Sequence, residues 1–369
     1  MSFIVEARDF IDVTKEKIFL RDFIINESIL KNIEYSPFVF REKINFFVNK
    51  KKEIIILNRN KVEKYDSSGN FIKSIKVKYE FKSFIEYNNK LYFLLCGDSS
   101  DTAGISTKGI YIYNWNGDLI KFVSYYYNGQ NMIEEIKTGN YITKYNFRSH
   151  FLMDFIITKD NIFSILVNKQ GVGYDINNKY AGQAYSLFVY NYANEKMINN
   201  WELENNVSLT ASDVSFSKDG FVYGLYNDDD NPYFKKLKIY SIWGDKIEDI
   251  FLLEHPSRIE LIGVDTNNNV YLAFFNTQEP IEIEPICAGS EKIIYQPIFN
   301  KSNHCILKTI LFNNKKWNIK GKIIILDSEL FGNYYKAKIG EDGYIYYTNV
   351  EILKDSVQGL VFNKIKILI

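Results

Sequence analysis

The 369-residue sequence predicts an all-β fold in which one four-stranded antiparallel unit repeats along the chain. Helical periodicity of any length is absent, and short β-branched and aromatic runs alternate with Asn, Asp and Gly turns. One hairpin pattern also recurs along the whole sequence. No Pro/Gly/Ser-rich linker divides the chain, so we expect residues 1–369 to form a single domain.

The first hairpin type is clearest at Val214–Leu225, where a short strand, a Lys-Asp-Gly turn and an apolar strand follow one another. Gly and Asp tolerate the positive φ that a tight hairpin requires. The other copies are, in chain order, Phe47–Leu57, Ile85–Leu95, Ile156–Leu166, Gly263–Phe274 and Lys338–Thr348.

A second hairpin type follows several of these copies. It joins an alternating strand that ends in Tyr or Phe to a strand that carries Lys or Glu at alternate positions. The copies are Val62–Ile75, Ile110–Val123, Leu187–Trp201, Leu237–Phe251 and a degenerate one at Ile310–Leu326. We expect the aromatic residues before the turns to pack along and between the sheets; they are Tyr65, Tyr113, Tyr190 and Tyr240.

Two consecutive hairpins make the four-stranded blade of a β-propeller. The Tyr-Asp-x-x-Gly-x-Phe-Ile turn within Val62–Ile75 resembles the NHL-type repeat, whereas the Trp-Asp ending of WD40 blades is absent. The resemblance implies a single six-bladed propeller of four-stranded antiparallel blades. Its members range from ligand-binding modules to lyases and hydrolases, so the fold alone assigns no function. Two tandem β-sandwiches are the alternative architecture.

The last unit lacks one strand, because after Thr348 the chain has room only for the strand Gly359–Leu368. The strand-like segment at residues 17–25 can supply the missing outer strand and so close the last blade. Such closure would remove an exposed sheet edge and tie the two ends of the chain together.

Composition excludes several classes of protein. Lys and Arg number 45, as do Asp and Glu, so the net charge is zero and the basic excess typical of nucleic-acid binding is missing. No apolar run approaches the length of a membrane span, and the N-terminus has no signal-peptide pattern. The odd, scattered cysteines suggest reduced thiols and therefore a cytoplasmic location.

The long connections all fall between hairpins or between blades, whereas the turns within hairpins are short. Connections of a propeller alternate between two faces, so these insertions should project as loops from one face, above the mouth of the central channel. Binding residues concentrate on loops held by a rigid scaffold. The insertions are Gly97–Lys108, Asn128–Arg148, Asn168–Ala184, Asn227–Phe234 and Asn276–Asn303.

Candidate ligand-binding residues lie in or beside two of these insertions. Arg148, His150 and Asp154 bring a histidine and both signs of charge close together, so they can hold a carboxylate or form a His-Asp pair. A locally satisfied hydrogen-bond cluster is the alternative reading. The segment Tyr174–Tyr185 offers aromatic rings and an acid for stacking on a sugar or peptide, with Tyr174, Asp175 and Tyr180 as candidate contacts.

Metal-binding signals are weaker. The consecutive acids Asp228, Asp229 and Asp230 supply the hard oxygen ligands that Ca²⁺ prefers, although a solvated loop tip is the simpler explanation of them. The sequence Asp265-x-Asn267-x-Asn269 resembles the start of a calcium loop, but Val270 stands where such a loop needs Gly, which indicates a hairpin turn.

These observations favour a non-catalytic module that presents its loop-built face to a peptide, glycan or protein partner, without a cofactor. The alternative is a hydrolase or lyase with carboxylates, and a bound calcium ion, at the channel mouth. Nothing in the sequence predicts the oligomeric state.

Overall fold

The computed structural model describes residues 15–20, 44–58, 60–96, 108–125, 133–138, 141–174, 179–191, 197–203, 213–227, 235–252, 258–275, 282–288, 292–298, 304–313, 315–318, 323–327, 337–352 and 358–365. The regular elements within these ranges are β-strands, and no helix there has the length and apolarity of a membrane span.

Sheets 1, 2 and 4, numbered here in chain order, are each four consecutive antiparallel strands. Sheet 1 contains β2 (Ile44–Val48), β3 (Ile54–Asn58), β4 (Lys61–Tyr65) and β5 (Phe71–Lys76). Sheet 2 contains β6 (Ser83–Tyr87), β7 (Lys90–Leu95), β8 (Gly109–Tyr113) and β9 (Leu119–Ser124). Sheet 4 contains β15 (Val214–Phe216), β16 (Phe221–Asn227), β17 (Lys235–Ser241) and β18 (Lys246–Leu252).

Sheets 3 and 5 each have five strands. Sheet 3 contains β10 (Ile133–Thr138), β11 (Tyr141–Ile157), β12 (Ile162–Tyr174), β13 (Lys179–Asn191) and β14 (Met197–Glu202). Sheet 5 contains β19 (Arg258–Val264), β20 (Val270–Phe275), β23 (His304–Asn313), β24 (Lys316–Asn318) and β25 (Ile323–Asp327). The degenerate hairpin at Ile310–Leu326 is thus an outer strand in two pieces, since β24 and β25 pair with opposite halves of β23.

Sheet 6 is built from both ends of the described chain. It contains β26 (Lys338–Ile339), β27 (Ile345–Ile352), β28 (Gln358–Ile365) and, as its outer strand, β1 (Lys15–Leu20). β1 runs antiparallel to β28, from Lys15 opposite Ile365 to Leu20 opposite Leu360. This strand begins two residues before the predicted segment 17–25, and residues 21–25 lie outside the described ranges.

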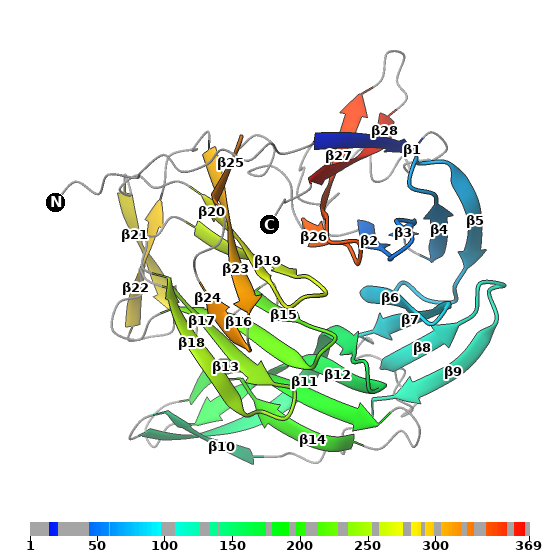
Figure 1. The fold of residues 1–369 in the computed structure, drawn as a ribbon. Helices are drawn as coiled ribbons and strands as arrows, with labels where there is room; N and C mark the ends of the chain where they lie inside the picture. The colour runs from blue at the N-terminus through cyan, green and yellow to red at the C-terminus, as the bar shows by residue number, and fades with distance from the viewer. Residues whose placement is uncertain are drawn as a thin grey trace.

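The sheets follow one another around a common centre, an arrangement that fits a β-propeller (Figure 1). Neighbouring sheets contact through one strand each, β11 in sheet 3 and the first strand in the other sheets, and through the turns beside these strands. Hydrogen bonds join sheets 1 and 2 (Asn45 Nδ2 to Lys82 O, 3.0 Å) and sheets 2 and 3 (Ser83 Oγ to Asp154 Oδ1, 2.7 Å). Others join sheets 3 and 4 (Lys159 N to Lys218 O, 3.0 Å) and sheets 4 and 5 (Asn268 Nδ2 to Asp219 Oδ2, 2.7 Å). The last sheet is joined to the first by Glu341 N to Val48 O, at 2.9 Å. Between sheets 5 and 6, β19 packs against β26.

Apolar side chains fill the spaces between successive sheets. The cluster around Phe93 joins sheets 1 and 2, and the cluster around Leu225 joins sheets 4 and 5. Three of the aromatic residues expected to pack before the turns are buried, namely Tyr65, Tyr113 and Tyr240. The prediction of a packing role is therefore confirmed for these three; the side chain of Tyr190 lies outside the description.

One five-residue turn recurs in hairpins of every sheet. The N–H of its first residue donates to the carbonyl of the fifth, and the N–H of the fourth donates to the carbonyl of the first. The fourth residue has a positive φ, which favours Gly or Asn there: 85° at Gly69, 83° at Gly220 and 65° at Asn268. Where the first residue is Asp or Asn, its side chain accepts further backbone bonds, as Asp66 does from Ser68 and Asn70.

Several of the expected loops are strands. Residues 128–148 contain β10 and the start of β11, and residues 168–184 contain the facing ends of β12 and β13. Residues 276–303 contain a separate hairpin of β21 (Glu282–Ala288) and β22 (Lys292–Ile298). The interpretation of these insertions as loops is therefore wrong, because strand pairing satisfies backbone groups that a long loop would leave exposed.

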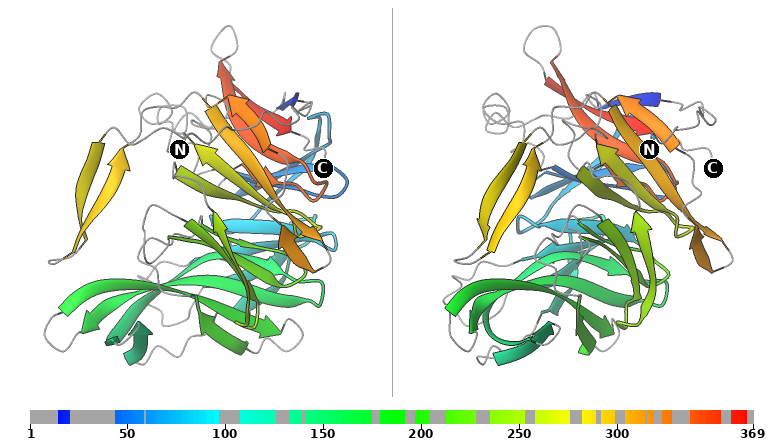
Figure 2. Two further views of the ribbon diagram at one scale, coloured as in Figure 1. Left: turned by 60° about the vertical axis from the view of Figure 1, so that its left-hand side comes forward. Right: turned by 90° about the vertical axis from the view of Figure 1, so that its left-hand side faces the viewer.

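The described extensions lie on one side of the molecule. In both views of Figure 2, the β21–β22 hairpin and the far ends of β11–β13 project in the same general direction. We call this side the long-hairpin face. The opposite side, which carries the five-residue turns such as those at residues 49–53, 158–162 and 217–221, is the short-turn face.

Candidate functional site

Most of the predicted ligand residues lie on the extended strands of the long-hairpin face. Arg148 and His150 belong to β11, Tyr174 ends β12, and Tyr180 is the second residue of β13. His150 pairs with Lys169, and Tyr180 pairs with Gly173. Arg148 lies at a shift of register between Phe147 and Ser149. Asp175 lies outside the described residues.

Asp154 connects two sheets. Its Oδ1 accepts a hydrogen bond from Ser83 Oγ of β6 at 2.7 Å and one from its neighbour's backbone, Phe155 N, at 2.9 Å. Asp154 lies four residues beyond His150, which is roughly 13 Å along an extended strand. The described bonds of Asp154 therefore contribute to the junction of sheets 2 and 3.

The predicted calcium ligands Asp228, Asp229 and Asp230 lie outside the described residues, so calcium binding there stays a prediction. Within the described ranges, no three His, Cys, Asp or Glu side chains are grouped closely enough to hold a metal. The second calcium-like sequence is a hairpin turn, as expected. Asp265 Oδ1 accepts from Asn267 N and Asn269 N at 2.8 and 2.9 Å, and its Oδ2 accepts from Tyr271 Oη at 2.9 Å.

On the short-turn face, Lys218 crosses the centre of the molecule. The side chain leaves the β15–β16 turn of sheet 4, forms an ion pair with Glu341 of sheet 6, and has Nζ 5.8 Å from the ring centroid of Tyr87 in sheet 2. These partners lie two sheets away in either direction around the ring. The Lys218 side chain therefore connects sheet 4 with sheets 2 and 6 near the common centre.

A buried polar network joins sheets 1 and 2. The Glu86 carboxylate accepts from Trp115 Nε1 at 2.7 Å, from Lys64 Nζ at 3.2 Å and from Asn49 Nδ2 at 2.6 Å. Lys64 also pairs with Glu53 at 2.7 Å. Partial burial raises the pKa of Glu53, but hydrogen bonds from Lys64 and Asn49 outweigh it and leave the pKa below its ordinary value. These pairings indicate a structural role.

Exposed apolar residues form a band along the outer strands of sheets 1–4. They occur at or just before the start of each strand, and the second residue of each of these four strands is an exposed isoleucine. Repetition in four sheets indicates an origin in the repeat itself rather than in one binding site. The band consists of Phe71, Ile72, Leu119, Ile120, Ile198, Trp243 and Ile247.

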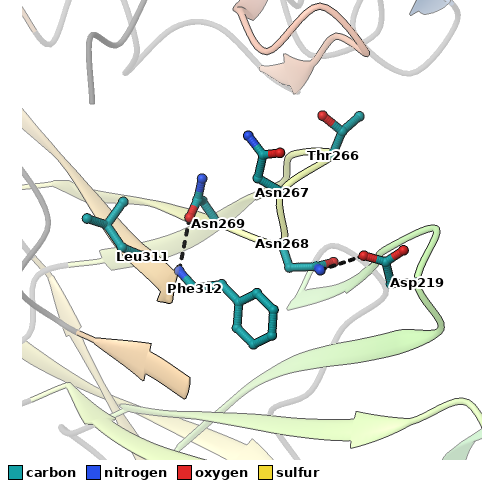
Figure 3. Close-up of a pocket in the computed structure, with 7 residues that line it drawn as sticks. All are labelled: Asp219, Thr266, Asn267, Asn268, Asn269, Leu311 and Phe312. Carbon is teal, nitrogen blue, oxygen red and sulfur yellow. Dashed lines mark hydrogen bonds between the residues drawn. The ribbon is translucent and has the colours of Figure 1, made fainter. Parts of the chain in front are cut away.

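A pocket on the short-turn face lies where sheets 4 and 5 meet (Figure 3). Its wall combines Asp219 of the β15–β16 turn, the β19–β20 turn from Thr266 to Asn269, and Leu311 and Phe312 of β23. The sequence predictions missed this pocket because its residues come from three separate turns and strands. The detectable signal was a turn with two uncharged polar residues, Thr266 and Asn267, where the five-residue turns of the other hairpins of the first type carry charges.

No protein-family model and no curated protein matches the chain. Solved structures with a similar course of the chain include BamB from Moraxella catarrhalis, at 10% identity and TM-score 0.33 over 88% of this chain and 85% of that one. A eukaryotic initiation factor has 9% identity and TM-score 0.33 over 87% and 85%. A structure from a study of two prolyl endopeptidases has 10% identity and TM-score 0.37 over 86% of this chain and 46% of that one. At these scores, the fold class rests on the strand pairing described above.

Proposed function

We propose that the chain is a six-bladed β-propeller of NHL-like type and acts as a non-catalytic binding module. Sheets 1–6 are its blades, and β1 completes the last blade beside β28. The contacts between successive sheets, including the bond from Glu341 N to Val48 O that links the last sheet to the first, support this ring. Removing the edge of β28 by pairing it with β1 is the expected benefit of such closure.

The long-hairpin face is the proposed binding surface, and its partner is a peptide, glycan or protein. The observation that carries the proposal is the one-sided projection of β21–β22 and the ends of β11–β13 (Figure 2). Insertions that grew without function would be tolerated at either face, since each doubling of loop length costs only about 0.6 kcal/mol. Arg148, His150 and Tyr180 on the extended strands, with Tyr174 and Asp175, are the proposed contacts.

The proposal is tested by shortening one hairpin. In the variant, a short Gly-Ser linker replaces residues 280–300, and a matched variant receives the same linker in place of residues 67–68 of a short turn. Each protein is immobilised and probed with a glycan array and a random peptide library. We expect the hairpin variant alone to lose the ligands that the full chain binds. Equal loss in both variants, or none in either, would place binding elsewhere.

The contact residues are tested separately by Arg148→Ala and His150→Ala in the full chain. We expect each substitution to weaken binding of the selected ligands at least several-fold while the unfolding midpoint stays unchanged. Calcium is tested at the same time by elemental analysis of the purified protein and by titration of Asp229→Asn. Bound calcium that this substitution removes would add a metal to the proposed surface.

A further inference from the structure

The pocket between sheets 4 and 5 is a second candidate site, on the face opposite the proposed partner surface. Its volume is about 520 Å³, within the range of small-molecule sites. Three elements surround it: the β15–β16 turn contributes Asp219, the β19–β20 turn contributes Thr266–Asn269, and β23 contributes Leu311 and Phe312 (Figure 3).

Part of the polar wall is held in place by hydrogen bonds within the protein. Asp219 forms an ion pair with Lys159 and accepts from Asn268 Nδ2 at 2.7 Å. Partial burial raises the pKa of Asp219, but the bonds from Lys159 and Asn268 outweigh it, so the pKa lies below its ordinary value. Asn269 accepts from Phe312 N at 3.0 Å. The carboxylate is therefore ionised at neutral pH and its charge is balanced by Lys159.

Two polar side chains remain available to a ligand. Thr266 and Asn267 are exposed, and neither side chain has a hydrogen-bond partner among the described residues. Figure 3 shows both side chains extending clear of the hydrogen-bonded groups below them. Together they offer an amide N–H₂, an amide oxygen and a hydroxyl, with the Leu311 side chain on the other side of the pocket.

The composition of this turn differs from that of its relatives. In the first hairpins of sheets 1, 3, 4 and 6, the second and third turn residues are charged: Lys50-Lys51, Lys159-Asp160, Lys218-Asp219 and Glu341-Asp342. Among the hairpins of the first type that contain this turn, only that of sheet 5 has uncharged hydrogen-bonding residues there, Thr266 and Asn267. Turn geometry does not require the difference, since the same two backbone hydrogen bonds close all of these turns.

This chemistry selects a neutral ligand with several hydroxyl groups. An anion would need a free cation, but none of the described residues that line the pocket is cationic, and Lys159, which contacts Asp219, is paired with it. An extended peptide would pair with a strand edge, whereas turns and side chains form most of this pocket's wall. Vicinal hydroxyls can donate to the Asp219 carboxylate and exchange hydrogen bonds with Asn267, while a C–H face of a sugar ring packs against Leu311.

We propose that this pocket binds a neutral monosaccharide unit, free or at the end of a glycan. Asp219, Thr266 and Asn267 supply the hydrogen bonds, and Leu311 supplies the apolar contact. The site does not depend on the long-hairpin face, so a protein with the shortened β21–β22 hairpin retains it.

The test uses the full-length protein and saturation-transfer NMR with the methyl glycosides of glucose, galactose and mannose and with N-acetylglucosamine. We expect at least one sugar to give a saturation-transfer signal. We expect Asn267→Ala to lower the affinity for that sugar 3- to 10-fold, as for the loss of one hydrogen bond. Asn116→Ala is the matched control, because Asn116 is an exposed asparagine at the third position of the same turn type. We expect it to change nothing.

Three results would overturn the proposal. The first is the absence of a signal from every sugar at 20-fold the concentration of the protein and above. The second is sugar binding that Asn267→Ala and Thr266→Ala leave unchanged while both variants unfold like the parent. The third is Asn267-dependent binding of N-acetylglycine methylamide, a probe for the peptide group, without binding of any sugar.

Discussion

The two faces of the molecule are built by different rules. On the short-turn face, the same five-residue turn recurs from sheet to sheet, and its ends are fixed by backbone bonds and by Asp, Asn or Ser side chains. On the long-hairpin face, the connections range from short segments to paired strands such as β21–β22. The difference shows that the regular repeat is maintained by the turns on the short-turn face. The connections on the long-hairpin face are therefore free to vary in length and structure. Four experiments address this comparison, in order of decreasing expected effect.

Deleting residues 1–20 should have the largest effect. The truncation removes β1 and uncovers one edge of β28 from Leu360 to Ile365. We expect the protein to lose cooperative unfolding, because the last sheet then has an open edge and no link to the N-terminal segment. Thermal unfolding followed by circular dichroism measures this. Replacement of residues 280–300 on the long-hairpin face should leave the unfolding temperature within a few degrees of the parent. A truncated protein that melts near the full-length temperature would contradict the closure.

Glu86→Ala should cost about 1–3 kcal/mol of unfolding free energy, because it leaves Trp115 Nε1 buried without its acceptor, whereas Lys64 keeps its pairing with Glu53. Urea unfolding at neutral pH measures the loss. Glu80→Ala is the control, since Glu80 is exposed and such surface changes usually stay within about 0.5 kcal/mol. Equal effects of the two substitutions would show that the buried network adds nothing to stability.

Substitutions at the fourth position of the turn should change the stability in opposite directions, depending on the residue that is present. Lys52 has φ 64° and Gly69 has φ 85° at equivalent positions. We expect Lys52→Gly to stabilise the protein by up to about 1 kcal/mol, because Gly adopts this conformation without a steric penalty, and Gly69→Ala to destabilise it by about 1 kcal/mol. Urea midpoints at constant slope measure both. Two changes of the same sign would mean that the turns are not equivalent.

The smallest effect concerns acid. Hydrogen bonds from Asn70 and from backbone N–H groups hold the pKa of Asp66 below its ordinary value of 3.8. The ionised group therefore stabilises the folded protein at neutral pH, and this contribution is lost as the pH falls through the lowered pKa. The parent should be more stable than the Asp66→Asn variant at pH 5, and this difference in unfolding free energy should shrink as the pH falls to 2. A difference that stays constant over this range would assign the stabilisation to packing alone.

The sequence predicted the hairpins well because their signals are local. Asp or Ser at the first turn position and Gly at the fourth mark Val62–Ile75 and Val214–Leu225 without knowledge of any distant contact. The same local information failed for residues 168–184. Residues 168–174 belong to β12 and residues 179–184 to β13, because their pairing with each other, and that of β12 with β11, satisfies a long stretch of backbone.

The candidate sites also differ in whether local sequence could predict them. His150 and Arg148 were singled out from their neighbours in sequence, and the structure places both on β11. The pocket formed by Asp219, Asn267 and Leu311 was not predicted, since residues 219 and 311 are far apart in the chain and meet only when sheets 4 and 5 pack together.

The sequence by itself determined the all-β class, the two hairpin types and the positions of the turns, since each depends on residues within about a dozen positions of one another. It also indicated a strand near the N-terminus that could pair with the last sheet. Only the tertiary structure decided that Lys218 reaches Glu341 and Tyr87 across the centre, that Glu86 is enclosed by Lys64 and Trp115, and which turns share a pocket. These contacts join different sheets, and sheet-to-sheet distances follow from packing, which local patterns do not contain.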